Sequence, residues 1–114
     1  MKLKDRVAIV TGGGKGIGQE ICLGLVKEGA KIVIAEIDIE NSEKAKKKII
    51  EAGSEAIIIK TDVSNQKSIN EMVDQTIKHY GKIDILINNA GIRHVKKLLD
   101  HTQQDWDDMI SVNL

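Results

Sequence analysis

The sequence predicts an α/β protein, a single domain over residues 1–114 built on a doubly wound parallel sheet. Its short apolar runs are nearly continuous rather than alternating, which is typical of strands that helices cover on both faces. Segments of helical apolar periodicity separate these runs. Each of these segments ends at a glycine, namely Gly29, Gly53 or Gly81, and glycine is a common residue just past the end of a helix.

Four strands and three helices follow from this pattern. The strands are expected at residues 7–10, 32–35, 56–59 and 83–87. The helices are expected at residues 17–28, 42–52 and 64–80, each with an apolar face. Because the crossover between two parallel strands is right-handed, this alternation of strands and helices predicts the strand order 3-2-1-4.

The last residues predict a fourth helix that begins at Thr102 and runs to the end of the chain. The Thr102 hydroxyl would cap the amide near Asp105, and the apolar positions would be Trp106, Met109, Ile110 and Leu114. The fourth strand would then be an unpaired sheet edge, and the last helix would lack a cap. We therefore interpret the chain as part of a longer protein, cut after the fourth strand and the start of the following helix.

Composition and charge exclude several classes of partner. Lys plus Arg equals Asp plus Glu at 17 each, so no net charge would attract the chain to nucleic acid or to an anionic membrane. The charged first residues and the early glycines leave no stretch that suits a signal sequence or a membrane span. The single cysteine, Cys22, cannot form an intramolecular disulfide. We expect a cytoplasmic protein without membrane or nucleic-acid partners.

Two further groups of polar residues have simple structural explanations. The lysine-rich stretch at residues 44–48 is interpreted as the solvated face of the second helix, where acidic neighbours can pair with it. His79, His94 and His101 fall on different elements without the spacing of metal ligands. We therefore expect no metal site.

A glycine-rich turn joins the first expected strand to the first expected helix. It reads Thr11-Gly12-Gly13-Gly14-Lys15-Gly16-Ile17-Gly18. Glycines there permit a tight turn and let backbone amides approach a pyrophosphate at the N-terminus of the helix. The phosphate-binding loop of nucleotidases is not matched, because Lys15 precedes Gly16 and no Ser or Thr follows it. The turn therefore predicts a dinucleotide-binding site.

Glu36 closes the second strand and predicts which dinucleotide is bound. An acidic side chain about 20 residues after the glycine turn can accept hydrogen bonds from the ribose hydroxyls and would repel a 2′-phosphate. Asp38, two residues later, is a rival for the same role. The acidic strand end favours NAD over NADP.

At this point the sequence resembles the short-chain dehydrogenase/reductase family. Four segments match its signatures in order and spacing, namely Thr11 to Gly18, Asp62-Val63, Asn88-Asn89-Ala90-Gly91 and Ser111-Val112-Asn113-Leu114. The resemblance covers the whole chain. It implies a Rossmann-like domain of an NAD(P)-dependent oxidoreductase that acts on an alcohol or carbonyl compound.

The resemblance implies roles for residues of the glycine turn. Gly12, Ile17 and Gly18 would hold the pyrophosphate, and Gly16 would shape the same cofactor-binding turn. Lys15 is similar to the basic residue of NADP-preferring family members. An acidic strand end normally outweighs it, so NAD remains the expected cofactor.

Later motifs supply the other cofactor contacts that the resemblance implies. Asp62 would bind the adenine amino group, and Val63 would present its backbone to the adenine. Asn89, with Ala90 and Gly91, would line the cofactor cleft. Asn88 is interpreted as a brace within the sheet, because asparagine beside glycine often hydrogen-bonds locally.

Only one residue matches the catalytic Asn, Ser, Tyr, Lys set that the resemblance implies. Asn113 matches the asparagine of that set, which would help to organise a proton relay. The family donates the proton from a tyrosine whose pKa is lowered by a lysine four residues later. The single tyrosine here, Tyr80, has Asp84 in that place and is interpreted as a packing residue. We therefore expect no turnover from these 114 residues alone.

Three functional hypotheses follow. The first is the cofactor-binding portion of an NAD-dependent oxidoreductase, expected to be a homo-oligomer. The second is a dinucleotide-binding module without chemistry. The third is a self-associating half-fold, whose unpaired fourth strand would pair with a second copy.

Overall fold

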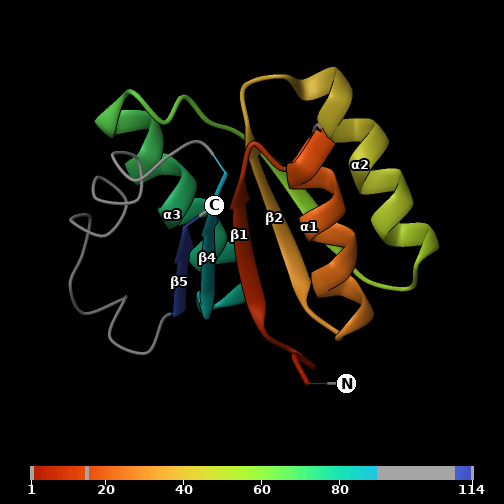
Figure 1. Cartoon of the computed structure of the whole chain (residues 1–114). Helices are drawn as coiled ribbons and strands as arrows, with labels where there is room; N and C mark the ends of the chain where they lie inside the picture. Colours follow the sequence, from red (N-terminus) through yellow and green to blue (C-terminus); the bar gives the residue numbers. More distant parts are fainter. Residues whose placement is uncertain (1, 15, 90–109, 114) are drawn as a thin grey trace.

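The computed structural model describes residues 2–14, 16–89 and 110–113 of the chain, which form five strands and three helices (Figure 1). The strands are β1 (Val7–Thr11), β2 (Lys31–Glu36), β3 (Ala56–Lys60), β4 (Ile85–Asn88) and β5 (Ile110–Asn113). The helices are α1 (Gly16–Lys27), α2 (Ile39–Glu51) and α3 (Gln66–Tyr80). None of these described helices has the length and the apolar character needed to cross a membrane.

The strands form one parallel sheet in the order β3-β2-β1-β4-β5. Val7 of β1 lies opposite Lys31 of β2, and Ala8 of β1 lies opposite Ile85 of β4. The predicted order 3-2-1-4 is confirmed. The order reverses direction between β1 and β4, the kind of position where sheets of this type bind their ligands at the carboxyl ends of the strands.

Helices cover both faces of the sheet (Figure 1). Ile9 of β1 belongs to a buried cluster with Met72 of α3 on one face. Val10, the next residue, belongs to the cluster on the other face with Cys22 of α1 and Ile49 of α2. Adjacent residues of β1 are therefore buried on opposite sides, which explains the continuous apolar run. The doubly wound α/β fold is confirmed.

The helices end where the sequence predicts, but two of them begin elsewhere. Gly29, Gly53 and Gly81 have φ angles of 93°, 93° and 81°, the left-handed conformation that favours glycine after a helix. Helix α2 begins three residues before the expected start, because the Asp38 side chain accepts a hydrogen bond from the Asn41 amide at 3.1 Å. Asn65 caps α3 in the same way.

The helix expected from Thr102 is wrong over residues 110–113, where the chain forms strand β5. Ile110 pairs with Ile85 and Asn113 pairs with Asn88, so β4 is not the unpaired edge that we expected. The sequence Ile-Ser-Val-Asn alternates β-branched and polar residues, a period-two pattern that suits a strand. Pairing also provides partners for backbone groups of β4. Thr102, Trp106, Met109 and Leu114 lie outside the described residues.

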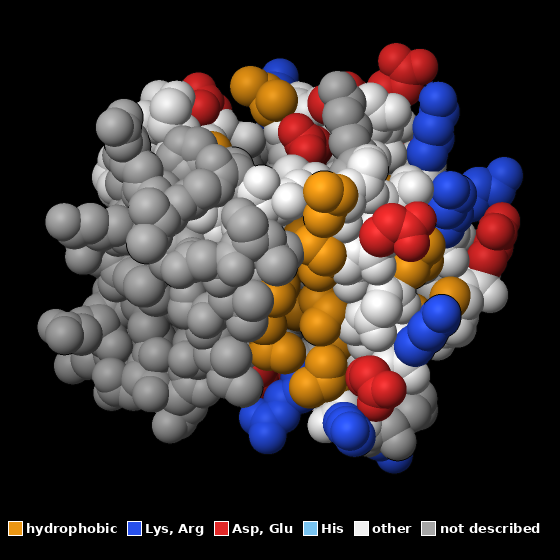
Figure 2. Space-filling view, in the orientation of Figure 1, with side chains coloured by type: hydrophobic (Ala, Val, Ile, Leu, Met, Phe, Trp, Pro, Cys, Tyr) orange, Lys and Arg blue, Asp and Glu red, His pale blue; other side chains and the backbone are white. Residues whose placement is uncertain are grey.

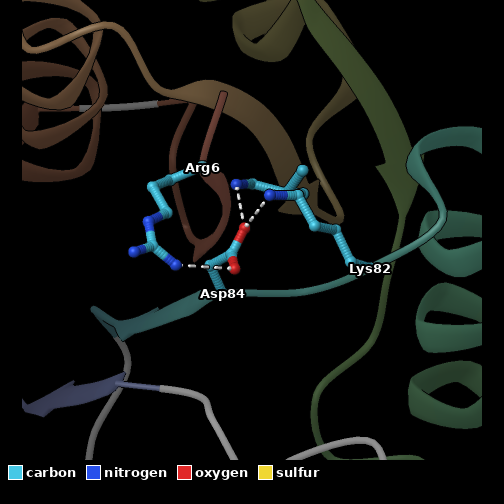
Figure 3. Close-up of polar contacts among 4 residues, drawn as sticks. Arg6, Lys82 and Asp84 are labelled. Carbon is cyan, nitrogen blue, oxygen red and sulfur yellow. Dashed lines mark hydrogen bonds and ion pairs between the residues drawn. The ribbon is translucent and has the colours of Figure 1, made fainter. Parts of the chain in front are cut away.

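The amino ends of β1 and β4 are joined by the carboxylate of Asp84 (Figure 3). It accepts hydrogen bonds from the Val7 amide at 2.8 Å and from Arg6 Nη1 at 3.3 Å, and it forms an ion pair with Lys82 Nζ at 3.0 Å. Burial alone would raise the pKa of Asp84, but the hydrogen bonds from Val7, Lys82 and Arg6, together with the charge of Lys82, lower it below its ordinary value. This explains why an acidic residue interrupts the apolar run before β4.

Candidate functional site

The glycine turn between β1 and α1 is packed too tightly for larger residues at key positions. Gly12 has a φ angle of 67°, and its amide donates a hydrogen bond to the Ala35 carbonyl of β2 at 3.0 Å. A Cβ atom on Gly18 would collide with the carbonyl oxygen of Gly12 and would lie 2.9 Å from Asn89 Nδ2. The first turn of α1 therefore sits directly on the end of β1, where its amides can meet an anion.

A network of hydrogen bonds holds this turn against the end of β4. The buried Thr11 hydroxyl donates to Asn88 Oδ1 at 3.1 Å and accepts from the Asn89 amide at 3.1 Å. Asn89 Nδ2 donates to the Gly12 carbonyl at 3.4 Å. Asn88 thus braces β1 against β4, as the sequence predicts. Asn89 orients the glycine turn itself.

A cavity of about 140 Å³ opens at the carboxyl ends of β1, β2 and β3. It brings together four of the residues that the sequence predicts as cofactor contacts, namely Gly12, Glu36, Asp62 and Val63. These residues are far apart in the chain and meet because neighbouring parallel strands end at the same edge of the sheet.

The Glu36 carboxylate is fixed by the backbone that follows it. Its Oε1 atom accepts hydrogen bonds from the Ile37 amide at 3.0 Å and from the Asp38 amide at 3.3 Å. Its Oε2 atom lies 3.8 Å from the position that a Cβ on Gly12 would take, so the carboxylate borders the glycine turn. The rival residue, Asp38, uses its own carboxylate to cap α2.

Asp62 is held at the other side of the cavity by the first residues before α3. Its Oδ1 atom accepts hydrogen bonds from the amide of Ser64 at 3.0 Å and from the hydroxyl of Ser64 at 2.6 Å. Its own amide donates to Ser68 Oγ at 2.8 Å. This local turn sets the direction of the chain at Asp62 and Val63.

Four lining residues of the cavity had no individual site role in the sequence prediction. They lie beside predicted residues, each at or next to a strand end, namely Thr11, Ala35, Ile37 and Thr61. Ile37 is 58% exposed, which is unusual for so large an apolar side chain. Their position follows from the register of the three strands. Aligning the ends of these strands would therefore have identified them as lining residues.

The remaining predicted residues lie outside this cavity or outside the described part of the chain. Gly16 and Ile17 begin α1, and the Ile17 side chain is 70% exposed. The backbone of Asn113 pairs with that of Asn88 in the sheet. Lys15, Ala90 and Gly91 lie outside the described residues. Among the described residues, no group of His, Cys, Asp or Glu side chains has an arrangement able to hold a metal ion.

Tyr80 is a packing residue, as the sequence predicts, and the buried side chain of Cys22 also packs in the core. Tyr80 packs against the cluster under α3, and burial together with the nearby charge of Glu55 raises its pKa to about 12. That shift is opposite to the one that a catalytic tyrosine needs at neutral pH. Cys22 is fully buried, and burial raises the pKa of its thiol to about 12, which favours the protonated form.

Comparison with known proteins gives a consistent result. Residues 6–114 match the family model described as short chain dehydrogenase. An uncharacterized oxidoreductase of Thermotoga maritima is 40% identical over 112 residues, which are 98% of this chain and 44% of that protein. The chain therefore spans less than half the length of that relative.

Solved structures show the same fold. A crystal structure of NAD+-bound xylitol dehydrogenase has a TM-score of 0.92 and 27% identity, over 99% of this chain and 54% of that one. A metagenomic short-chain oxidoreductase in complex with NADP has a TM-score of 0.91 and 24% identity, over 99% of this chain and 63% of that one. The two neighbours carry different cofactors, so the fold alone does not decide between NAD and NADP.

Proposed function

Because this chain belongs to the short-chain dehydrogenase family, we propose that it is the NAD-binding portion of an oxidoreductase for an alcohol or carbonyl substrate. The observation that carries the proposal is the single cavity in which Gly12, Glu36, Asp62 and Val63 meet. Each of these residues lies at or just beyond the carboxyl end of a strand, where a sheet of this topology binds ligands.

The pyrophosphate of the dinucleotide is proposed to lie at the N-terminus of α1. The close approach of Gly18 to the Gly12 carbonyl brings the first turn of the helix against the glycine turn. Free backbone amides at a helix N-terminus, together with the helix dipole, attract a negative group. Ile17 is proposed to cover the pyrophosphate with its exposed side chain.

Glu36 is proposed to select NAD by binding the adenosine ribose. The two amides that bind its Oε1 atom hold the carboxylate in one place. The carboxylate would accept hydrogen bonds from both ribose hydroxyls and would repel a 2′-phosphate. The capping role of Asp38 supports Glu36 over its rival. Lys15, a basic residue similar to that of NADP-preferring family members, would favour NADP and so reduce the preference for NAD.

The adenine ring is proposed to bind between Ile37 and Val63, which both line the cavity. An apolar side chain left half in water gains stability when a flat ring covers it. Asp62 would accept a hydrogen bond from the adenine amino group, and its contacts with Ser64 hold it in position. Asn89 is proposed to orient the turn that faces the cofactor. Ala90 and Gly91 are proposed as further cofactor contacts on the ground of the family resemblance alone.

When bound, the nicotinamide supplies or accepts the hydride, while the protein must handle the proton. Asn113 is proposed to belong to the proton relay, since its backbone lies beside Asn88 at the carboxyl end of the sheet. The 114 residues contain no tyrosine followed by a lysine four positions later. A polypeptide of this sequence alone is therefore expected to bind cofactor without turnover, which is also what a non-catalytic module would do.

Calorimetric titration tests the proposal. The purified chain is titrated with NAD, ADP-ribose and nicotinamide mononucleotide, with its size followed by light scattering because we expect a homo-oligomer. NAD and ADP-ribose should bind with similar affinity, and nicotinamide mononucleotide should bind far more weakly, because the proposed contacts concern the adenosine and pyrophosphate. A folded chain that binds neither NAD nor ADP-ribose would contradict the proposal.

A further inference from the structure

A second cavity, of about 600 Å³, lies on the other side of the glycine turn, between α1 and α2. Gly14, Gly16 and Gln19 line it from the turn and from α1. The rest of its wall comes from α2 and is rich in lysine. It shares no lining residue with the dinucleotide cavity, although both border the same turn. We call this second cavity the lysine groove.

Three lysines of α2 face the lysine groove, namely Lys44, Lys47 and Lys48. Positions three and four apart in a helix lie on the same side, so these ammonium groups are neighbours. Figure 2 shows basic side chains gathered over α2 at the right of the view, with acidic ones beside them. The chain as a whole has a formal net charge of +0, so this is a local excess.

The acidic residues of α2 form no ion pair with these lysines among the described residues. Glu40 and Glu43 each precede one of the lysines by four residues, and Glu51 follows Lys47 by four, the spacing of helical ion pairs. Within the described residues, however, the ion pairs are Arg6–Asp84, Lys31–Glu55 and Lys82–Asp84. Glu51 is the single carboxylate among the described residues that line the groove.

One of the three lysines is already directed across the groove. Lys48 Nζ donates a hydrogen bond to Gln19 Oε1 of α1 at 3.2 Å. This contact ties the two walls together and holds one ammonium group in place without cancelling its charge. A ligand that enters the groove would therefore meet a partly ordered set of donors.

We propose that the lysine groove is a binding site for a multiply charged phosphate group, separate from the dinucleotide cavity. Three ammonium groups against one carboxylate give a local charge that matches a polyphosphate or a phosphate ester. Lysine is a common phosphate ligand because it supplies a compact charge and several donors. The volume is in the range of small-molecule sites. The proposal does not depend on the oxidoreductase function.

Titration with inorganic triphosphate tests the proposal, with a matched set of variants. The variant K44Q/K47Q/K48Q removes the three ammonium groups of the groove. The control variant K27Q/K67Q/K78Q removes three exposed lysines that do not line it. We expect the groove variant to weaken triphosphate binding by at least about tenfold and the control by less than about twofold. Equal weakening in both variants, or no binding by the native chain, would overturn the proposal.

A third variant gives an effect in the opposite direction. Glu51→Gln removes the one carboxylate of the groove wall at an exposed position, so folding should be unaffected. Triphosphate should bind about threefold more tightly to this variant, because a repulsive charge is gone. Weaker or unchanged binding would count against the groove as the site.

Competition shows which source of phosphate uses the groove. Triphosphate should still bind when the chain is saturated with NAD, since the two cavities share no residue. Displacement by NADP but not by NAD would show that the lysines bind the extra phosphate of that cofactor, and it would also overturn the claim of a separate site. Retention in the presence of both would identify a free polyphosphate or phosphate ester. Displacement by NAD would overturn the claim of a separate site.

Discussion

Glu36 is the residue on which cofactor choice is proposed to depend. One oxygen of its carboxylate accepts hydrogen bonds from the Ile37 and Asp38 amides, and the other lies near Gly12. The sequence predicts the residue and its place at the end of a strand. It does not predict the two amide contacts, because these depend on the backbone angles after β2. Those contacts make the carboxylate a rigid part of the cavity.

Replacing Glu36 by Gln should narrow the preference for NAD over NADP. The glutamine side chain keeps an oxygen that can accept hydrogen bonds from the backbone amides of Ile37 and Asp38. It loses the negative charge that would repel a 2′-phosphate. Loss of a charged hydrogen bond of about 1.5–3 kcal/mol weakens NAD binding by about tenfold or more. Calorimetric titration with both cofactors measures the change, and Glu43→Gln on α2 is the charge-matched control. An unchanged preference would assign the selection to another residue.

Asp84 provides a second residue-scale prediction, which concerns stability. Replacing it by Asn leaves the Val7 amide and two cations with a neutral partner, which should cost about 1–3 kcal/mol of the free energy of unfolding at pH 7. Urea unfolding measures the loss. Glu71→Gln, an exposed change on α3, should be nearly neutral.

The pH dependence of the Asp84 effect has a definite sign. The pKa of Asp84 is lowered in the folded chain, so its ionised form stabilises the fold above the ordinary value of 3.8. This contribution is lost as the pH falls through the lowered pKa. The difference between the native chain and Asp84→Asn should therefore shrink in strongly acidic buffer. A difference that stays constant down to that range would contradict the role of the charge.

At the scale of elements, the same helix contains two glycines with opposite expected effects. A Cβ on Gly18 would collide with the Gly12 carbonyl, so Gly18→Ala should displace the glycine turn and weaken NAD binding strongly. A Cβ on Gly24 meets nothing within 4 Å, so Gly24→Ala should stabilise α1 by about 1 kcal/mol without affecting binding. Titration and urea unfolding of both variants separate the two effects. Equal effects on binding would contradict the close approach.

Most elements of the described fold are predictable from sequence, and the exceptions have physical causes. The helix ends are predictable because glycine marks them directly. The start of α2 is missed because the Asp38 cap precedes the first periodic apolar residue. Strand β5 is missed because it is only four residues long. Over so short a segment, the positions of Ile110 and Val112 fit the apolar periodicity of a helix as well as that of a strand. Its pairing with β4 is a long-range contact that no local pattern contains.

For the candidate site, the sequence predicts residue types but not their mutual contacts. Gly12, Glu36, Asp62 and Val63 were predicted, and they line one cavity. Ile37 and Thr61 were not, because an apolar or hydroxyl residue beside a motif has no signature of its own. The Thr11 contacts with Asn88 and Asn89 require the register of β1 against β4.

At the scale of the whole molecule, strand β1 lies at the centre of the sheet and should be its most stable part. It pairs with β2 on one side and with β4 on the other, and its side chains belong to both buried clusters. Among the described residues, strand β3 pairs with β2 alone and forms an edge of the sheet. Amide hydrogens open locally with free energies that range from near zero at edges to the global value in the core.

Hydrogen exchange, followed by NMR residue by residue, measures this gradient. We expect the amides of Ile9 and Val10 to exchange only through global unfolding, and the outward-facing amides of β3 to exchange much faster. Bound NAD should slow the amides of Gly12, Ile37 and Asp38, because these lie at the proposed ribose and pyrophosphate contacts. Slowing confined to α2 and Gln19 would instead indicate that the dinucleotide occupies the lysine groove. Equal protection of β1 and β3 would show that the sheet opens as one unit, and that its edge is as stable as its centre.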